Sequence, residues 1–297
     1  MRFAFIGRLT LSGPLSFGQN IESLGIFTGF AVPFTVDQGL RQDPRFYPKV
    51  ILRANPIGFF YGYDKTGYGF ALTPSYTQIG QEYTIHNTSG GQVGIRDIHL
   101  NYITVPVALK IHINDLAFFR LSLVASIAPS FLVTGQETMT FSASKLDYPS
   151  GVSVPTTPGY TIAYDGVFVP QTNNEVYVSK NKFNVLQLFG AIGLRSDFDL
   201  NDNWSLNFDG RANFGIFDPR TSSYIRTLKN PSAATPDAYG QPGSPDIYGA
   251  RRDIYLSLQI GICRIFQYKQ KFATHESGKL ATHYKPPKNK KRSPIHK

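Results

Sequence analysis

The sequence has a single cysteine, Cys263, in 297 residues. No internal disulfide can form, so an exported chain of this kind must gain its stability from other interactions. It also has no run of 18 or more apolar residues, which argues against a membrane-spanning helix. This absence does not exclude a membrane-spanning β-barrel, because alternating strands never produce such a run.

Charged residues are scarce as well, at 17% of the chain. In contrast, Tyr and Phe contribute 17 and 23 residues and Gly contributes 27. This composition favours β structure over disorder or a coiled coil. The length suits one large β-barrel or two ordinary domains.

The first 18 residues, MRFAFIGRLTLSGPLSFG, have the pattern of a secretory signal peptide. Basic Arg2 and Arg8 precede a short apolar segment, and small Ser16 and Gly18 stand three residues and one residue before a cut at Gln19. We therefore predict a signal peptide over residues 1–18. A buried first strand is the alternative.

The last 31 residues carry most of the net charge. Residues 267–297 contain nine Lys or Arg and only Glu276 as an acid, giving +8 of the total of +10. The segment has no folded nucleic-acid recognition element, so we expect no nucleic acid as partner. We predict a mostly disordered periplasmic tail that can bind an anionic or protein partner there.

Six aliphatic residues alternate with small or polar ones in ITVPVALKIHI, residues 103–113. This spacing predicts a strand with one apolar face, since a helix would spread the same residues around its whole circumference. Seven further segments share the pattern, with the weakest at 50–63, where Pro56 interrupts it. The predicted strands cover residues 24–34, 50–63, 68–76, 103–113, 116–134, 183–198, 203–217 and 254–266.

Short and long connections alternate along the chain. DKTG, ND and DLNDN join three pairs of predicted strands as tight turns, whereas the other connections cover residues 35–49, 77–97, 135–182 and 218–253. This is the plan of an outer-membrane barrel with short periplasmic turns, long extracellular loops and both ends of the chain in the periplasm. We predict an all-β fold, an eight-stranded antiparallel up-and-down transmembrane β-barrel over residues 19–266 that contacts outer-membrane lipid.

A soluble lipocalin-like ligand-binding barrel would show the same alternation. Three features favour the membrane: the stripes are long enough to cross a bilayer, the opposite stripe is small and polar, and aromatic residues flank the short turns. These aromatic residues are Tyr61, Tyr63, Tyr68, Phe198, Trp204 and Phe266.

The runs LNYITVPVALKIHINDLAFFRLSLVASIAPSFLVTG and LQLFGAIGLRSDFDLNDNWSLNFDGRANFGIFD, with the closing YLSLQIGICRIF, resemble the Bacteroidetes outer-membrane β-barrel domain family, often labelled PorT-like. The ending LSFGQN also resembles signal-peptide ends of those bacteria. The chain departs from the family pattern in its 135–182 loop and its basic tail. For some relatives the resemblance implies a role in secretion or gliding machinery.

Several charged residues fall on the inward stripe of the predicted barrel. The lumen of eight strands is just wide enough to be filled by side chains, and buried charges must be paired. We therefore expect a structural ion-pair network, with a conduction path as the alternative. The residues are Lys110, Arg120, Arg195, Asp197, Asp209 and Arg211.

The sequence indicates no catalytic, cofactor or metal site. His86, His99 and His112 cannot be combined with a Ser/Asp pair or two carboxylates at one rim. The tail residues His275 and His283 are too far apart, as is His296, for a recognised metal site. We expect the chain to be no enzyme but a structural or partner-docking protein, whose Tyr-rich loops contact the partner. A small-solute channel or transporter is the second hypothesis.

Overall fold

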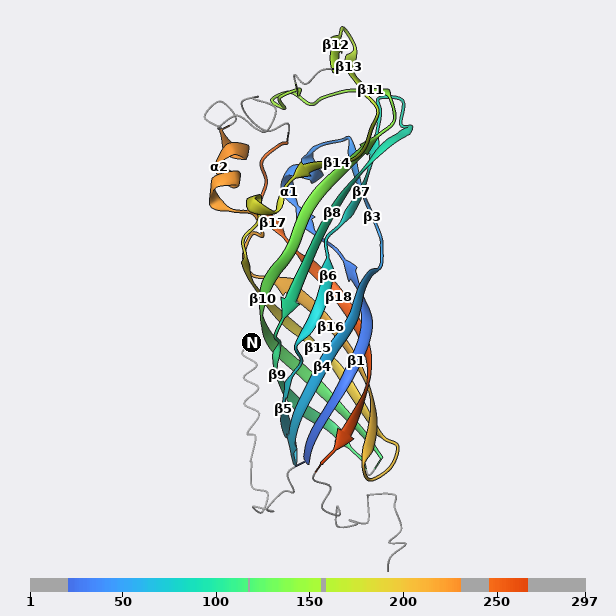
Figure 1. Ribbon diagram of the computed structural model, residues 1–297, viewed down its shortest axis with the longest axis vertical. Helices are drawn as coiled ribbons and strands as arrows, with labels where there is room; N and C mark the ends of the chain where they lie inside the picture. The colour runs from blue at the N-terminus through green and yellow to red at the C-terminus, as the bar shows by residue number, and fades with distance from the viewer. Residues whose placement is uncertain (1–20, 117, 156–158, 231–245, 267–297) are drawn as a thin grey trace, which may run out of the picture.

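The computed structural model describes residues 21–116, 118–155, 159–230 and 246–266, which form a closed barrel with a folded extension at one end (Figure 1). The signal peptide expected over residues 1–18 and the tail expected over residues 267–297 lie outside the described residues. No helix in the described ranges is long and apolar enough to cross a membrane.

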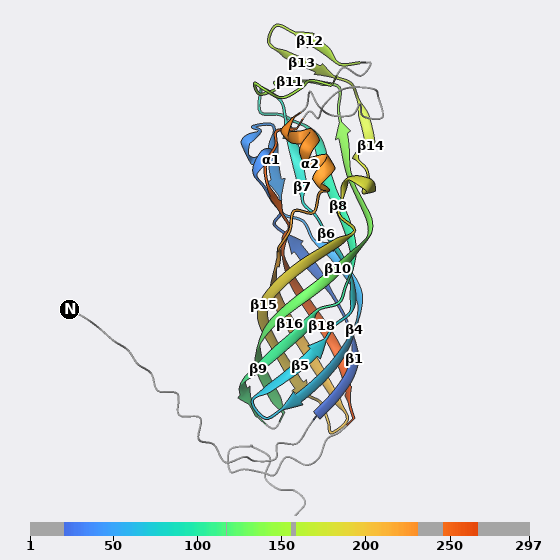
Figure 2. The same cartoon turned by 90° about the vertical axis from the view of Figure 1, so that its left-hand side faces the viewer.

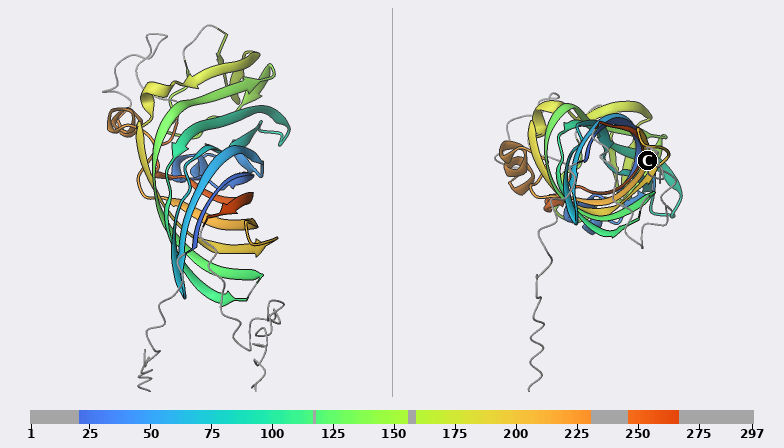
Figure 3. Two further views of the ribbon diagram at one scale, coloured as in Figure 1. Left: turned by 60° about the horizontal axis from the view of Figure 1, so that its bottom comes forward. Right: turned by 90° about the horizontal axis from the view of Figure 1, so that it is seen from below.

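Eight antiparallel strand positions close the ring, which Figure 3 shows from below. The strand β18 pairs with β1, opposing Ile262 to Ile26, and completes the circle. This confirms the predicted eight-stranded up-and-down barrel. Around the ring lie β1 (Ile21–Pro33), β4 (Arg53–Lys65), β5 (Tyr68–Leu72) with β6 (Ser75–Ile79), β8 (Gln92–Thr104) with β9 (Val107–Asp115), β10 (Phe119–Phe141), β15 (Leu186–Asp199), β16 (Trp204–Gly215) and β18 (Ile254–Ile265).

Prolines lie in three neighbouring strand positions at one level of the wall, and two of them interrupt the strand. Pro74 separates β5 from β6, and Pro106 separates β8 from β9. The Thr73 N–H donates to the Pro106 carbonyl at 3.1 Å, and the Val105 N–H donates to the carbonyl of Pro129 in β10 at 3.0 Å. Because proline has no N–H, each strand accepts a hydrogen bond here but lacks one donor.

The aliphatic stripe of β9 faces outward, as predicted. Val107, Leu109 and Ile111 are between 40% and 55% exposed, whereas Ala108 and Lys110 between them are buried. The other barrel strands repeat this arrangement and together form a continuous apolar band of the kind that contacts lipid. Exposed members of the band include Leu24, Ile26, Ile57, Phe59, Leu123, Ile127, Ile192, Leu194, Leu258 and Ile260.

The aromatic residues expected around the short turns lie on the barrel surface at that end. Tyr61, Tyr68, Trp204 and Phe266 are 41% to 55% exposed. Tyr and Trp prefer the boundary between hydrocarbon and water, where a ring can be buried and its polar atom hydrated. These four residues therefore mark the periplasmic edge of the apolar band.

The segments predicted as long loops are partly ordered strand, which corrects the sequence analysis. The strand β10 continues for 23 residues to Phe141, and β8 already begins at Gln92. Above the band β10 pairs with β14 (Thr172–Val178), β8 pairs with β7 (Glu82–His86), and β7 pairs with β3 (Phe46–Lys49) (Figure 2). These five strands form an extracellular sheet that was not predicted from the sequence, because its alternating stretches are short, as in Glu82–His86, where only Tyr83 and Ile85 are apolar.

Shorter elements complete the extension. The strands β11 (Ser144–Leu146), β12 (Thr161–Ala163) and β13 (Gly166–Val169) form a small sheet at its tip (Figure 1). Below it, β2 (Val36–Asp37) pairs with β17 (Arg251–Arg252). The helices α1 (Gln38–Gln42) and α2 (Ser222–Lys229) begin at side-chain caps, from Asp37 and Thr221, and the short helix η1 (Lys180–Lys182) precedes β15.

Candidate functional site

The six charged residues predicted to point inward are all buried inside the barrel. Two carboxylates that the sequence analysis did not select, Asp64 of β4 and Asp115 of β9, pair with them. We call these eight residues the lower network. Its members are Asp64, Lys110, Asp115, Arg120, Arg195, Asp197, Asp209 and Arg211.

Asp64 connects two cations at the periplasmic end of the lower network. Its Oδ1 lies 2.6 Å from the Lys110 Nζ, and its Oδ2 lies 3.2 Å from an Arg120 Nη. A buried carboxylate is stable only when charge and hydrogen bonds replace its lost hydration, and here two cations do so. The sequence analysis missed Asp64 because it follows the predicted strand with the weakest alternation.

Arg195 and Arg211 fill the lumen farther from the short turns. Arg195 lies 2.9 Å from Asp197 and 3.5 Å from Asp209, and Arg211 lies 2.5 Å from Asp209. The Arg195 guanidinium also stacks at 3.8 Å over the Phe60 ring. Four cations thus face four carboxylates, so the lower network closes the lumen without net charge.

The lower network also contacts a serine and a histidine. The His112 Nδ1 lies 2.8 Å from the Ser122 Oγ, and its Nε2 lies 3.5 Å from Asp64. No Ser/His/Asp set at a rim of the barrel was predicted from the sequence. The Ser122 side chain is fully buried, and β10 pairs with β15 and with β9 at this residue.

The other two histidines named from the sequence lie apart in the extension. His86 packs on Tyr47 with 4.6 Å between ring centroids, and the His99 Nδ1 lies 3.1 Å from an Arg53 nitrogen. Neither histidine belongs to a cluster of acids. In the part of the chain that the structure describes, no group of three or more His, Cys, Asp or Glu side chains could hold a metal ion.

A second buried cluster fills the extension above the apolar band. Arg96 donates from Nε to Glu137 at 3.0 Å and makes two hydrogen bonds of 2.8 Å to Asp246. Arg251 binds the other Glu137 oxygen and donates to Asp37 at 2.6 Å. We call this cluster the upper network. It consists of Asp37, Arg96, Glu137, Asp218, Arg220, Asp246 and Arg251.

Glu137 is the centre of the upper network and is fully buried. Burial alone would raise the pKa of Glu137, but the guanidiniums of Arg251 and Arg96 outweigh it and lower the pKa to about 2. The residue lies six positions beyond Phe131 of β10, outside the apolar band. The carboxylate is therefore charged throughout the physiological range and links β10 to Arg96 of β8 and to Arg251 of β17.

No feature of the sequence indicated the upper network. Arg96, Glu137 and Arg251 lie in segments interpreted as loops, and 41 and 114 residues separate the two arginines from the glutamate. Alternation reports only which face a residue occupies within one strand. It does not report which distant segments meet, so this cluster could not be predicted.

The model of a family described as "Outer membrane protein beta-barrel domain" matches residues 17–219. No curated protein matches the chain. Similar solved structures include Ail of Yersinia pestis, with 12% identity over 82% of this chain and 98% of that chain and a TM-score of 0.31. OprG of Pseudomonas aeruginosa has 12% identity over 84% and 97%, with a TM-score of 0.35.

The outer membrane protease OmpT of Escherichia coli is also among the similar structures. It shares 10% identity over 84% of this chain and 97% of that chain, with a TM-score of 0.36. We expected the chain to be no enzyme, because the predicted barrel has no recognisable catalytic site. This expectation is wrong, because an outer-membrane barrel among the similar structures is a protease. An eight-stranded plan in the sequence does not exclude catalysis.

Proposed function

The chain belongs to the outer membrane protein beta-barrel domain family and lies in the outer membrane, and on that premise we propose that it presents its extracellular extension to a protein partner. The barrel acts in this proposal as an anchor with a closed lumen. The soluble lipocalin-like alternative is wrong, because the chain is an outer-membrane protein.

The filled lumen supports an anchor over a channel. Arg195 is only 2% exposed and Arg211 only 5%, and both pair with Asp209, which lies on the neighbouring strand for Arg195 and on the same strand for Arg211. An aqueous path would leave such side chains hydrated and partly free. The paired charges favour a structural role for the lumen.

Apolar side chains at the tip of the extension carry the docking proposal. Ile162 of β12 is 74% exposed and Phe168 of β13 is 49% exposed, on opposite faces of the small sheet of β11, β12 and β13, and Tyr164 in the turn between these two strands is fully exposed. This sheet lies at the end of the molecule opposite the short turns (Figure 2). Exposed aromatic and aliphatic residues outside the lipid band are typical of protein interfaces. The partner in this proposal is a protein with an apolar pocket that takes these side chains.

The PorT-like resemblance suggests a finer form of this proposal, in which the partner belongs to secretion or gliding machinery. We also propose that residues 1–18 are a signal peptide and that the basic tail over residues 267–297 lies in the periplasm. The positions of Ile21 and Ile265 support the second point, because β1 begins and β18 ends at the short-turn end of the barrel (Figure 1).

Photo-crosslinking in intact cells tests the docking proposal. A photoreactive amino acid at Tyr164 should give one discrete protein adduct, which the Ile162→Asp and Phe168→Asp substitutions abolish without lowering the amount of barrel in the outer membrane. The same probe at Ser89, in the exposed turn between β7 and β8, is the control. Equal adducts from both positions, or none from Tyr164, would contradict the proposal.

A further inference from the structure

The wall of the barrel opens at the upper edge of the apolar band. Paired residues join β10 and β15 as far as Phe131 and Leu186, and one more hydrogen bond runs from the Leu132 N–H to the Val185 carbonyl at 2.8 Å. Beyond it β15 gives way to η1, and β10 pairs with β14 from Glu137 onward. A notch therefore remains between β10 and η1.

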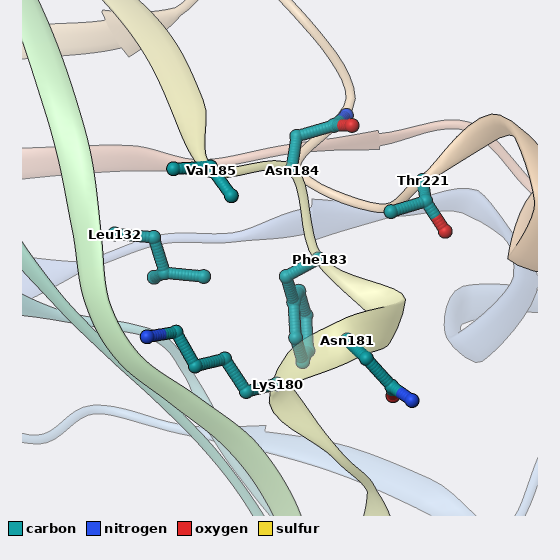
Figure 4. Close-up of a pocket in the computed structure, with 7 residues that line it drawn as sticks. All are labelled: Leu132, Lys180, Asn181, Phe183, Asn184, Val185 and Thr221. Atoms are coloured by element: carbon teal, nitrogen blue, oxygen red, sulfur yellow. The ribbon is translucent and has the colours of Figure 1, made fainter.

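This notch contains a cavity of about 510 Å³, shown in Figure 4. The volume is within the range of known ligand sites, roughly 300 to 1,000 Å³. The cavity is lined by Leu132, Lys180, Asn181, Phe183, Asn184, Val185 and Thr221.

The apolar part of the cavity is continuous with the lipid-facing surface. Leu132 and Phe183 are buried behind it, and Val185 at its lower edge is 64% exposed. Leu186, next in the chain, is 58% exposed and belongs to the apolar band. A hydrocarbon chain lying along the band can therefore enter the cavity without crossing a polar barrier.

The other part of the cavity is positively charged. Lys180 is exposed, and Figure 4 shows its side chain extending beside Phe183 toward Leu132. Lys182 lies two residues away, with its ammonium 5.9 Å from the Tyr224 ring. Within the described ranges neither lysine has a carboxylate in salt-bridge distance, whereas nearby Arg220 is neutralised by Asp218. Thr221 caps α2, whose N-terminus adds partial positive charge at the same edge.

We propose that this cavity binds a membrane lipid of the outer leaflet that carries a phosphate in its headgroup. One acyl chain packs on Leu132, Phe183 and Val185, and the phosphate lies between the ammonium groups of Lys180 and Lys182. The cavity lies at the upper edge of the apolar band. Its apolar surface is therefore at the depth of the acyl chains of a lipid, and its cationic surface is at the depth of the headgroups. The proposal depends on the location in the membrane and is independent of the docking partner.

Native mass spectrometry of the full-length protein in detergent tests this assignment, with dimyristoyl phosphatidic acid as the probe. We expect one retained lipid per barrel, and about 10- to 30-fold weaker binding in the double variant Lys180→Gln, Lys182→Gln. The double variant Lys49→Gln, Lys145→Gln removes the same charge elsewhere in the extension and should bind like the unmodified protein. Equal losses in both variants would show unspecific attraction to positive charge and would overturn the proposal.

Two further measurements separate the acyl chain from the phosphate. Val185→Thr keeps the side-chain shape but removes apolar surface, and it should weaken lipid binding about threefold. Dimyristoyl glycerol, which lacks the phosphate, should not be retained, and millimolar inorganic phosphate should not displace the lipid. Displacement of the lipid by inorganic phosphate would overturn the lipid site. So would unchanged lipid binding in both the Val185→Thr variant and the Lys180→Gln, Lys182→Gln variant.

Discussion

Lys110 and Asp64 form their 2.6 Å ion pair across Gly69. The strand β5 lies between β4 and β9, and Gly69 is the residue of β5 that opposes both Asp64 and Lys110. A side chain at this position would occupy the space in which the ammonium and the carboxylate meet. The glycine is therefore a requirement of the lower network.

Gly69→Ala should destabilise the barrel. The added methyl carbon would lie 1.9 Å from the Asp64 Oδ1, so the carboxylate must leave Lys110, at a cost of about 3 kcal/mol. Urea unfolding of the refolded protein, followed by the fluorescence of Trp204, the sole tryptophan, measures this loss. Gly190→Ala is the control, because its new methyl group meets no atom within 4 Å. Equal stability of the two variants would contradict the role given to Gly69.

Val107→Arg should impair assembly of the barrel. Val107 is 55% exposed on the lipid-facing band, and an arginine there costs roughly 2 to 4 kcal/mol near the membrane centre. Val107→Leu should be harmless, and the inward Ala108→Ser should have a small effect. The measurement is the fraction of folded protein in outer-membrane fractions, and equal fractions for the arginine and leucine variants would exclude a lipid contact at this residue.

The closed lumen predicts almost no stable conductance in a planar bilayer. Arg195 and Arg211 are buried in the interior and are paired with Asp197 and Asp209, so we expect these side chains to block a water path. Steady currents through the unmodified protein, abolished by Arg195→Gln or Arg211→Gln, would be the opposite result. Such currents would make the channel hypothesis the better account.

Acid should loosen the extension through Glu137. Its pKa falls from the ordinary 4.5 to about 2 on folding, so its contribution to stability is complete above pH 4.5 and is lost as the pH falls from 4.5 toward 2. The contribution is on the order of 3 kcal/mol. Hydrogen exchange of residues 92–100 and 135–141 should accelerate over this range. Glu137→Gln should exchange faster at neutral pH but lack this acid-dependent step, and identical pH profiles would disprove the assignment.

The periplasmic location proposed for the basic tail, residues 267–297, makes a prediction about topology. A variant that ends at Tyr268 should still fold and insert, but it should lose any salt-sensitive association in the periplasm, since exposed charges are screened within about 10 Å at 0.1 M salt. Protease added to intact cells should cut within residues 147–165 and spare the tail. Tail cleavage from outside would reverse the assigned orientation.

The membrane-spanning half of the fold was predictable because it obeys one local rule. Stretches such as 103–113 and 254–266 alternate strictly, since one face meets lipid and the other a packed lumen, and Lys110 and Arg195 could be assigned inward from parity alone. The extension follows this rule only over short stretches. Glu137 lies between Gln136 and Thr138, in a polar stretch that resembles a loop.

In the lower network, the presence of ion pairs was predictable from the sequence, but not all of the partners were. The alternation of inward and outward residues indicated that Asp197 and Asp209 needed cationic partners. The partner of Lys110, however, is Asp64, which is 46 residues away on β4, a strand that does not pair with the β9 strand of Lys110. The cavity at Lys180 had no sequence signal either. It exists because β10 continues upward where β15 ends, and that difference in strand length is a property of the assembled sheet.

The row formed by Pro74, Pro106 and Pro129 gives the molecule a mechanical joint. Each of three adjacent strands lacks a hydrogen-bond donor at this level, so the wall there has fewer cross-strand bonds than the wall above or below. A sideways load on the extension will bend the sheet first along this row. The extension can then tilt together with the proposed protein partner. The lower barrel, which is held by lipid and by the lower network, keeps its shape and its position in the bilayer.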